Sequence, residues 1–94
     1  MPAYWIGRVN VTNPDGYAKY AALAGPAIQK HGGKFLARGG KVQTLEGTGY
    51  ARNVVVEFES LEKAAACYNS PEYQEALKHA KTSAVRDVIV VEGV

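Results

Sequence analysis

The sequence predicts an α+β fold with the element order β-α-β-β-α-β, the split βαβ arrangement. Three observations predict it. An alternating apolar segment opens the chain, two strand-like segments flank a glycine-rich turn in the middle, and an apolar run over residues 88–91 closes it. Helical stretches that begin with capping residues separate these strands. We expect a four-stranded antiparallel sheet with two helices on one face, and one domain over residues 1–94, because this length leaves no room for a second core.

Local patterns predict the first strand and the first helix. Side chains alternate over residues 4–11, with Trp5 and Val9 on one face and Tyr4 and Ile6 on the other. The segment Asn13-Pro14-Asp15 then supplies a cap, a proline suited to the first helical turn and an acid that complements the helix dipole. The apolar stripe expected along this helix is Tyr17, Tyr20, Ala21, Ala24 and Ile28.

Three glycine-containing segments divide the first half of the chain. Gly25-Pro26 predicts a kink or two helical pieces, because Pro26 has no N–H for the carbonyl of Ala22. Gly32-Gly33 supplies a left-handed residue that ends the helix. Residues 34–38 then form a short strand, Gly39-Gly40 a bulge or sharp bend, and residues 41–45 an extended continuation that leads into a hairpin connection over residues 46–50.

The second half of the chain repeats the pattern of strand, helix and strand. Residues 53–58 alternate as a strand, and Ser60 caps the helix that follows. Ser70-Pro71 breaks that helix and starts a second piece, because a cap is followed by a proline at the first position. Residues 86–92 form the last strand, which is apolar on both faces.

Composition excludes several classes of function. The net charge is only +2, and the basic residues are scattered rather than clustered with aromatics, so we expect no nucleic-acid partner. No apolar run approaches the roughly 20 residues that span a bilayer, and the first residues lack the pattern of a signal peptide, so we expect no membrane association and a cytoplasmic location. Cys67 is the only cysteine, which excludes an intrachain disulfide and a cysteine metal cluster, and we expect it to be buried and inert.

Motif searches give no cofactor site. The segment around Gly40-Lys41 lacks the glycine and the Ser or Thr that a phosphate loop needs, and Gly47-Thr48-Gly49 lacks the third glycine of a dinucleotide fingerprint. His31 and His79 have no metal ligand at helical spacing, and both are interpreted as surface residues. We therefore expect no cofactor and no metal.

The second face of the sheet predicts a partner chain. Tyr4, Ile6, Val55 and half of the last strand are apolar on the face that the helices leave bare. An apolar patch of this kind marks an interface or a groove, and two such sheets packed face to face would form a barrel-like dimer. We expect a homodimer.

Three charges inside strands are the candidate functional residues: Arg8, Arg38 and Glu57. In an apolar cavity, buried ions need partners. One interpretation is structural, a salt bridge of Arg8 or Arg38 with Glu57. The other is functional, with an arginine that binds a carboxylate and a glutamate that acts as acid or base.

Several segments resemble a family of small bacterial domains, domain of unknown function 1330. They span nearly the whole chain, and Arg38-Gly39-Gly40 and Ser70-Pro71-Glu72-Tyr73 are the most specific of them. The other matching segments are Pro2-Ala3-Tyr4, Asn13-Pro14-Asp15-Gly16-Tyr17, Gly32-Gly33, Val56-Glu57-Phe58-Glu59-Ser60-Leu61 and Val91-Glu92-Gly93.

The resemblance implies a ferredoxin-like fold that forms a dimeric α+β barrel, in a superfamily that contains cofactor-free monooxygenases and isomerases. The family brings no established reaction. Carried over by position, Arg38, Glu57 and Tyr73 are the best pocket candidates, whereas Arg8 and Cys67 depart from the family's pattern.

Three hypotheses follow. In the first, a cavity between the sheet and its helices binds a small anionic organic molecule, with Arg38 and Arg8 as ligand-binding arginines, Glu57 as a catalytic base and Tyr17 or Tyr73 as hydrogen-bond donors. In this hypothesis the domain either only binds the molecule or also acts on it as a cofactor-free enzyme. In the second, the domain is a non-catalytic structural or interaction module without a small-molecule substrate. In the third, it holds a haem or a metal, which only the two histidines could ligate.

Overall fold

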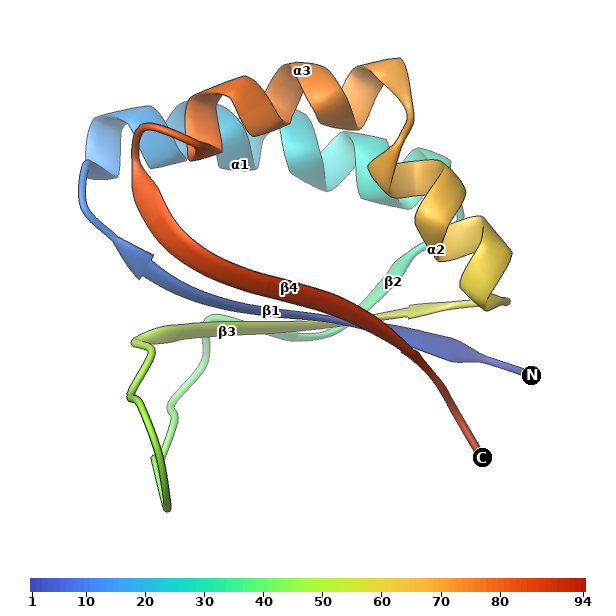
Figure 1. Ribbon diagram of the computed structural model, residues 1–94. Coiled ribbons are helices and arrows are strands. Elements are labelled where there is room, and N and C mark those ends of the chain that lie inside the picture. Colours follow the sequence, from blue (N-terminus) through green and yellow to red (C-terminus); the bar gives the residue numbers. More distant parts are fainter.

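The computed structural model describes residues 1–94 and confirms the predicted order of elements, with the second helical stretch divided in two (Figure 1). The elements are β1 (Ala3–Val11), α1 (Pro14–Lys30), β2 (Lys34–Arg38), β3 (Arg52–Phe58), α2 (Leu61–Tyr68), α3 (Pro71–Ala80) and β4 (Ala84–Glu92). None of the three helices is both long enough and apolar enough to cross a bilayer.

The four strands form one antiparallel sheet in the order β2-β3-β1-β4. The pairings of β1 with β3 and with β4 place Trp5 between Val56 and Val90. Because side chains alternate along a strand, Trp5, Gly7 and Val9 share one face, here named the helix face, and Tyr4, Ile6 and Arg8 share the other, here named the open face.

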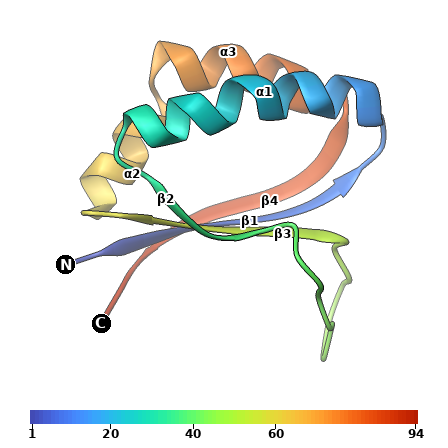
Figure 2. The same cartoon turned by 180° about the vertical axis from the view of Figure 1, so that it is seen from behind.

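All three helices cover the helix face, and nothing but one loop covers the open face (Figures 1 and 2). Helices α1 and α3 lie side by side above the sheet in both views, and α2 lies at one end. The loop between β2 and β3 descends on the opposite side of the sheet from the helices. The predicted arrangement, with helices on one face only, is therefore confirmed.

Each helix begins at the predicted capping residue. The side chains of Asn13, Ser60 and Ser70 accept hydrogen bonds from the backbone N–H three residues onward. These caps satisfy N–H groups that have no partner inside the helix. At the other end of α1, Gly32 has a φ of +85°, so the predicted left-handed residue is also confirmed.

The predicted division of the first helix is wrong, because α1 continues through Pro26. Pro26 and Ala22 both lie on the exposed side of the helix. Water can therefore hydrate the carbonyl that Pro26 leaves without a donor, and the apolar face of α1 stays intact.

The predicted extension of β2 is also wrong, because residues 41–45 belong to no strand. Pairing of β2 with β3 ends at Arg38 opposite Val54, and Gly39 follows with a φ of +70°. That backbone turn takes the chain off the sheet. The register shift in β2 lies between Phe35 and Ala37 rather than at the glycines.

The core fills the space between the helices and the helix face. Its centre is an aromatic group in which the ring centroids of Trp5 and Tyr73 are 5.0 Å apart, edge to face, and those of Trp5 and Phe58 are 6.0 Å apart. An aromatic side chain buries about 150–250 Å². At about 25 cal/mol per Å², each contributes roughly 4–6 kcal/mol, so these rings dominate the apolar burial.

Candidate functional site

A cavity lies between α1 and the centre of the helix face. Its floor is β1 at Gly7 and Val9, and its roof is α1 from Tyr17 to Ile28. The lining is mostly apolar, and its members are Trp5, Gly7, Val9, Tyr17, Tyr20, Ala21, Ala24, Gly25, Ile28, Phe35, Arg38, Arg52, Val54 and Arg86. About 450 Å³ is free of atoms, including the open mouth, and a water molecule's centre can move through about 30 Å³ of it. The enclosed part of the cavity is therefore small, and it is continuous with solvent at its mouth.

Three arginines from three strands converge on this cavity: Arg38 on β2, Arg52 on β3 and Arg86 on β4. Arg52 and Arg86 both pair with Val9, one from each side, so their Cα atoms are about two strand spacings, roughly 10 Å, apart. All three side chains therefore leave the sheet on the helix face.

None of these arginines forms a salt bridge. The three ion pairs of the structure join Lys30 and His31 to Glu72, and Lys78 to Glu75. No Asp or Glu lines the cavity. The Nε atoms of Arg52 and Arg86 are buried and have no hydrogen-bond partner. Buried cationic donors without partners are costly, so an anion in the cavity would stabilise the domain.

Aromatic rings hold the guanidinium groups in place. Arg38 lies 4.1 Å from the ring centroid of Phe35, and Arg86 lies 4.6 Å from that of Tyr20. Arg52 lies 5.9 Å from the ring of Tyr17. Such cation–π contacts restrain the cations without neutralising them, so the positive charge stays available to a ligand.

The hydroxyls of two tyrosines meet beside Arg86. The oxygens of Tyr20 and Tyr73 are 2.7 Å apart, and Arg86 donates from Nη2 to Tyr20 at 2.9 Å and to Tyr73 at 3.0 Å. Burial raises the pKa of both tyrosines above the ordinary value of about 10. Both therefore stay neutral and act as hydrogen-bond donors or acceptors, not as bases.

Glycines make room for the site. A Cβ on Gly25 would come within 2.8 Å of Nη2 of Arg38, and a Cβ on Gly39 would overlap the guanidinium of Arg52. On the floor, a Cβ on Gly7 would have no neighbour closer than 4.0 Å. The absence of a side chain at Gly7 therefore leaves part of the cavity open.

Comparison with known proteins shows the family to which the chain belongs. The model of a family described as a domain of unknown function, DUF1330, matches residues 2–94. The chain belongs to this family. No curated protein matches the DUF1330 chain.

Solved structures show that the DUF1330 chain has a ferredoxin-like α+β fold. It is similar to a protein of unknown function from Rhodopseudomonas palustris, with a TM-score of 0.82 and 20% identity, over 99% of this chain and 82% of that one. It is also similar to SnoaB, a cofactor-independent oxygenase from Streptomyces nogalater (TM-score 0.70, 7% identity, 99% and 93% covered). A third structure is a dimeric protein of unknown function with a ferredoxin-like fold from Bacteroides fragilis (TM-score 0.67, 12% identity, 98% and 96% covered). At these identities the likeness establishes the fold alone.

The structure brings together only some of the residues named from the sequence. Arg38 and Tyr17 line the cavity. Tyr73 does not, because it is fully buried behind Tyr20, which it contacts through its hydroxyl. Arg8 and Glu57 lie on the open face, away from the cavity.

Arg8 and Glu57 do not pair with each other. Arg8 donates a 2.7 Å hydrogen bond to the carbonyl oxygen of Thr48 and lies 4.5 Å from the ring centroid of Tyr50. Glu57 accepts a 3.4 Å hydrogen bond from the hydroxyl of Tyr4. The structural interpretation, a salt bridge to Glu57, is therefore not formed by Arg8 or by Arg38. Arg8 instead ties the long loop to the sheet.

Sequence reasoning missed Tyr20, Arg52 and Arg86 as site residues. The signal was present in the alternation of the strands. Arg52 lies two and four residues before Val54 and Val56, and Arg86 lies two and four residues before Val88 and Val90, so each arginine is on the same face of its strand as these valines. Both arginines therefore had to point with the apolar residues that face the helices.

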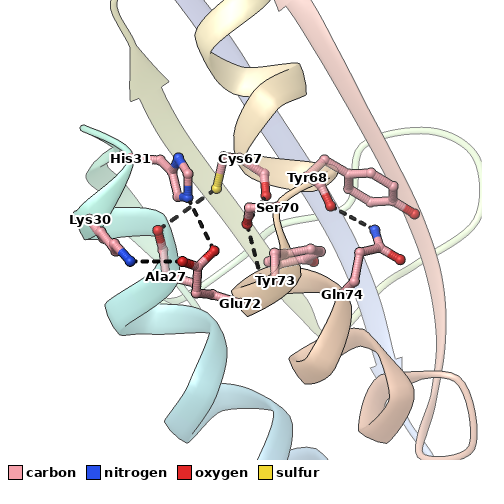
Figure 3. A network of polar contacts seen from close by, with 9 residues as sticks. All are labelled: Ala27, Lys30, His31, Cys67, Tyr68, Ser70, Glu72, Tyr73 and Gln74. Carbon is pink, nitrogen blue, oxygen red and sulfur yellow. Dashed lines mark hydrogen bonds and ion pairs between the residues drawn. The ribbon is translucent and has the colours of Figure 1, made fainter.

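A second polar cluster lies where α1 ends against α3 (Figure 3). The Nζ of Lys30 donates to Glu72 at 2.7 Å, and Nε2 of His31 lies 3.6 Å from the same carboxylate. The hydrogen bond from Lys30 lowers the pKa of Glu72 to about 2.

Nearby, burial raises the pKa of the Cys67 thiol to about 11, so this cysteine is protonated and unreactive at neutral pH, as expected from the sequence. No group of three or more His, Cys, Asp or Glu side chains is placed to hold a metal ion.

Proposed function

We propose that the DUF1330 domain binds a small anionic organic molecule in the cavity under α1. One observation carries the proposal: three arginines reach an apolar cavity whose lining contains no carboxylate. Arginine presents several N–H donors in a plane that matches a carboxylate, and its pairing with an anion is strong in a partly dry site. The apolar lining would receive the body of the ligand.

Binding, rather than proton transfer, is what the lining supports. A general base works best when its pKa lies near the working pH. The titratable groups of the lining are arginines and tyrosines, and burial raises the pKa of Tyr20 further. Glu57, named from the sequence as a base, lies on the open face and does not reach this ligand.

We also propose that the domain is a homodimer whose open faces pack together. Val85, Ile89 and Val91 of β4 point away from the helices and are 59%, 57% and 46% exposed. The same face carries Arg8 and Lys34 as cations and Glu57 and Asp87 as anions, so a second copy related by two-fold symmetry offers both apolar contact and opposite charge. The structurally similar Bacteroides fragilis protein is described as dimeric.

A ligand screen tests the binding site. Wild-type protein is heated with acetate, propionate, butyrate or benzoate, each over a concentration series. Binding only to the folded state at ten times Kd would raise Tm by roughly 6–11 °C, since about 1.4 kcal/mol is gained and 1 kcal/mol corresponds to about 4–8 °C in a domain of this size. Arg52→Ala and Arg38→Ala should abolish the shift.

Arg8→Ala is the matched control, because Arg8 lies on the opposite face of the sheet. It should keep the ligand-dependent shift. The absence of stabilisation by every carboxylate would contradict the proposal and favour a module without a small-molecule ligand. Loss of the bound carboxylate or uptake of oxygen during incubation would instead identify catalysis.

A further inference from the structure

We infer that the cavity selects fully deprotonated oxyanions over neutral ligands of the same shape, and that Tyr20 is a specificity-determining residue because its hydroxyl can only donate to a ligand. This inference rests on the proposed function and names the protonation state of the ligand.

The direction of the hydrogen bond between the two tyrosines follows from their burial. Only one proton lies between the two oxygens, which are 2.7 Å apart. Tyr73 is fully buried and does not line the cavity, and its hydroxyl meets only Tyr20 and Arg86. If Tyr20 donated, the proton of Tyr73 would be left in the interior without an acceptor, since Arg86 has none to offer. Tyr73 therefore donates to Tyr20.

This direction determines what Tyr20 offers to a ligand. Its oxygen accepts from Tyr73 and, at 2.9 Å, from Nη2 of Arg86. A hydroxyl has two acceptor lone pairs, and both are then used. What remains is the proton of Tyr20, on a residue that lines the cavity. Because Arg86 and Tyr73 both donate to the oxygen, they polarise the hydroxyl and strengthen its own donation.

The other polar groups of the lining also donate. Arg38, Arg52 and the Nε1–H of Trp5 have no acceptor atoms. Tyr17 is the one lining side chain whose hydroxyl keeps an acceptor, and no Asp, Glu, Asn, Gln, Ser, Thr or His is present. An alcohol, an amine or a protonated acid would therefore find an acceptor for its own N–H or O–H only at Tyr17, among groups that otherwise donate. A site of this kind discriminates strongly, because a mismatched partner leaves buried polar groups unpaired.

Matched pairs of probes test the inference on the wild-type protein. The affinities of acetate, propionate, butyrate and benzoate are compared by calorimetry with those of ethanol, 1-propanol, 1-butanol and benzyl alcohol. We expect each carboxylate that binds to do so roughly a hundredfold or more tightly than its alcohol. Equal affinity within a pair would overturn the inference without any need for a variant.

Three tyrosine variants then assign the effect. Tyr20→Phe should weaken carboxylate binding about tenfold or more, since one donor to an anion is lost. Tyr73→Phe should leave an acceptor lone pair on Tyr20, so the preference for carboxylate over alcohol should narrow while carboxylate affinity changes less. Tyr68→Phe is the control, because the ring of Tyr68 packs 5.3 Å from that of Tyr73 while its hydroxyl stays outside the network.

The outcomes separate the two proposals. If no carboxylate binds to wild-type protein, the proposed function fails. If carboxylates bind in an Arg52-dependent manner but Tyr20→Phe behaves like Tyr68→Phe, the role of Tyr20 is wrong and the binding function stands. A change in the ratio of carboxylate to alcohol affinity is the decisive readout, because a loss of stability alone would lower both affinities together.

Discussion

Gly25 of α1 and Arg38 of β2 lie against each other in the lining of the cavity, so closely that a Cβ on Gly25 would come within 2.8 Å of Nη2 of Arg38. Glycine in a helix interior is unfavourable by about 1 kcal/mol relative to alanine. The sequence nevertheless places one there, where it gives space to a cation. The helix gives up some stability at Gly25, and the arginine gains its position over Phe35.

Gly25→Ala should therefore separate stability from binding. We expect the free energy of unfolding in urea to stay equal or rise by up to about 1 kcal/mol, because alanine favours the helix and the end of Arg38 can move aside. Carboxylate affinity should fall several-fold in the same protein, toward that of Arg38→Ala. An unchanged affinity in Gly25→Ala, with a clear loss in Arg38→Ala, would show that the contact does not position the arginine.

Gly7 offers the complementary test on the cavity floor. A Cβ there meets nothing closer than 4.0 Å, so Gly7→Val should fold, strengthen the central strand and fill part of the cavity. We expect a higher Tm without ligand and no further shift with any carboxylate. Gly7→Ala, which adds a single carbon, should raise Tm while retaining part of the binding. Full ligand-dependent stabilisation of Gly7→Val would place the anion elsewhere.

The helix starts could be predicted from the sequence because their causes are local. The side chain of Asn13 accepts from the N–H of Gly16, and that of Ser70 from the N–H of Tyr73, each within one turn of chain. The end of β2 could not be predicted in this way. An extended segment forms a strand only when another strand lies beside it. The turn at Gly39 directs residues 41–45 away from β3, so they have no strand to pair with.

The residues of the candidate site also differ in whether a local sequence pattern could predict them. The alternation of side chains along a strand puts Arg52 and Arg86 on the same face as the apolar side chains. These two arginines could therefore have been predicted from the sequence. Arg38, predicted from the sequence as a ligand-binding residue, lies in the lining of the cavity. The contact between Tyr20 and Tyr73 joins residues 53 positions apart on two helices, and no local pattern encodes it. Glu57 and Arg38 point to opposite faces of the sheet, and this could be seen only once the register of the paired strands was known.

The open face gives a prediction about assembly. Ile89→Lys places a charge at the centre of the exposed β4 surface, where packing against a second copy would bury it without a partner. We expect light scattering to give the mass of two chains for wild-type protein and of one chain for Ile89→Lys at micromolar concentration. Leu23→Lys is the control, because Leu23 is similarly exposed but lies on α1, on the other side of the sheet. A wild-type mass of one chain would contradict the homodimer.

The ion pair of Lys30 and Glu72 ties the end of α1 to the start of α3 and predicts a pH dependence of stability. The hydrogen bond from Lys30 holds the pKa of Glu72 at about 2 in the folded state, below the ordinary value of 4.5. A carboxyl whose pKa falls on folding stabilises the folded state above its unfolded pKa, and this contribution is lost as the pH drops from about 4.5 toward 2. Glu72→Gln should therefore show a shallower loss of stability over this range than wild type in urea unfolding. The difference should be small and should shrink at high salt, because the pair is exposed.

Glu75→Gln is the matched control, since Glu75 pairs with Lys78 within α3 and does not join two helices. Identical pH profiles for wild type and Glu72→Gln would show that the pair forms without stabilising the fold.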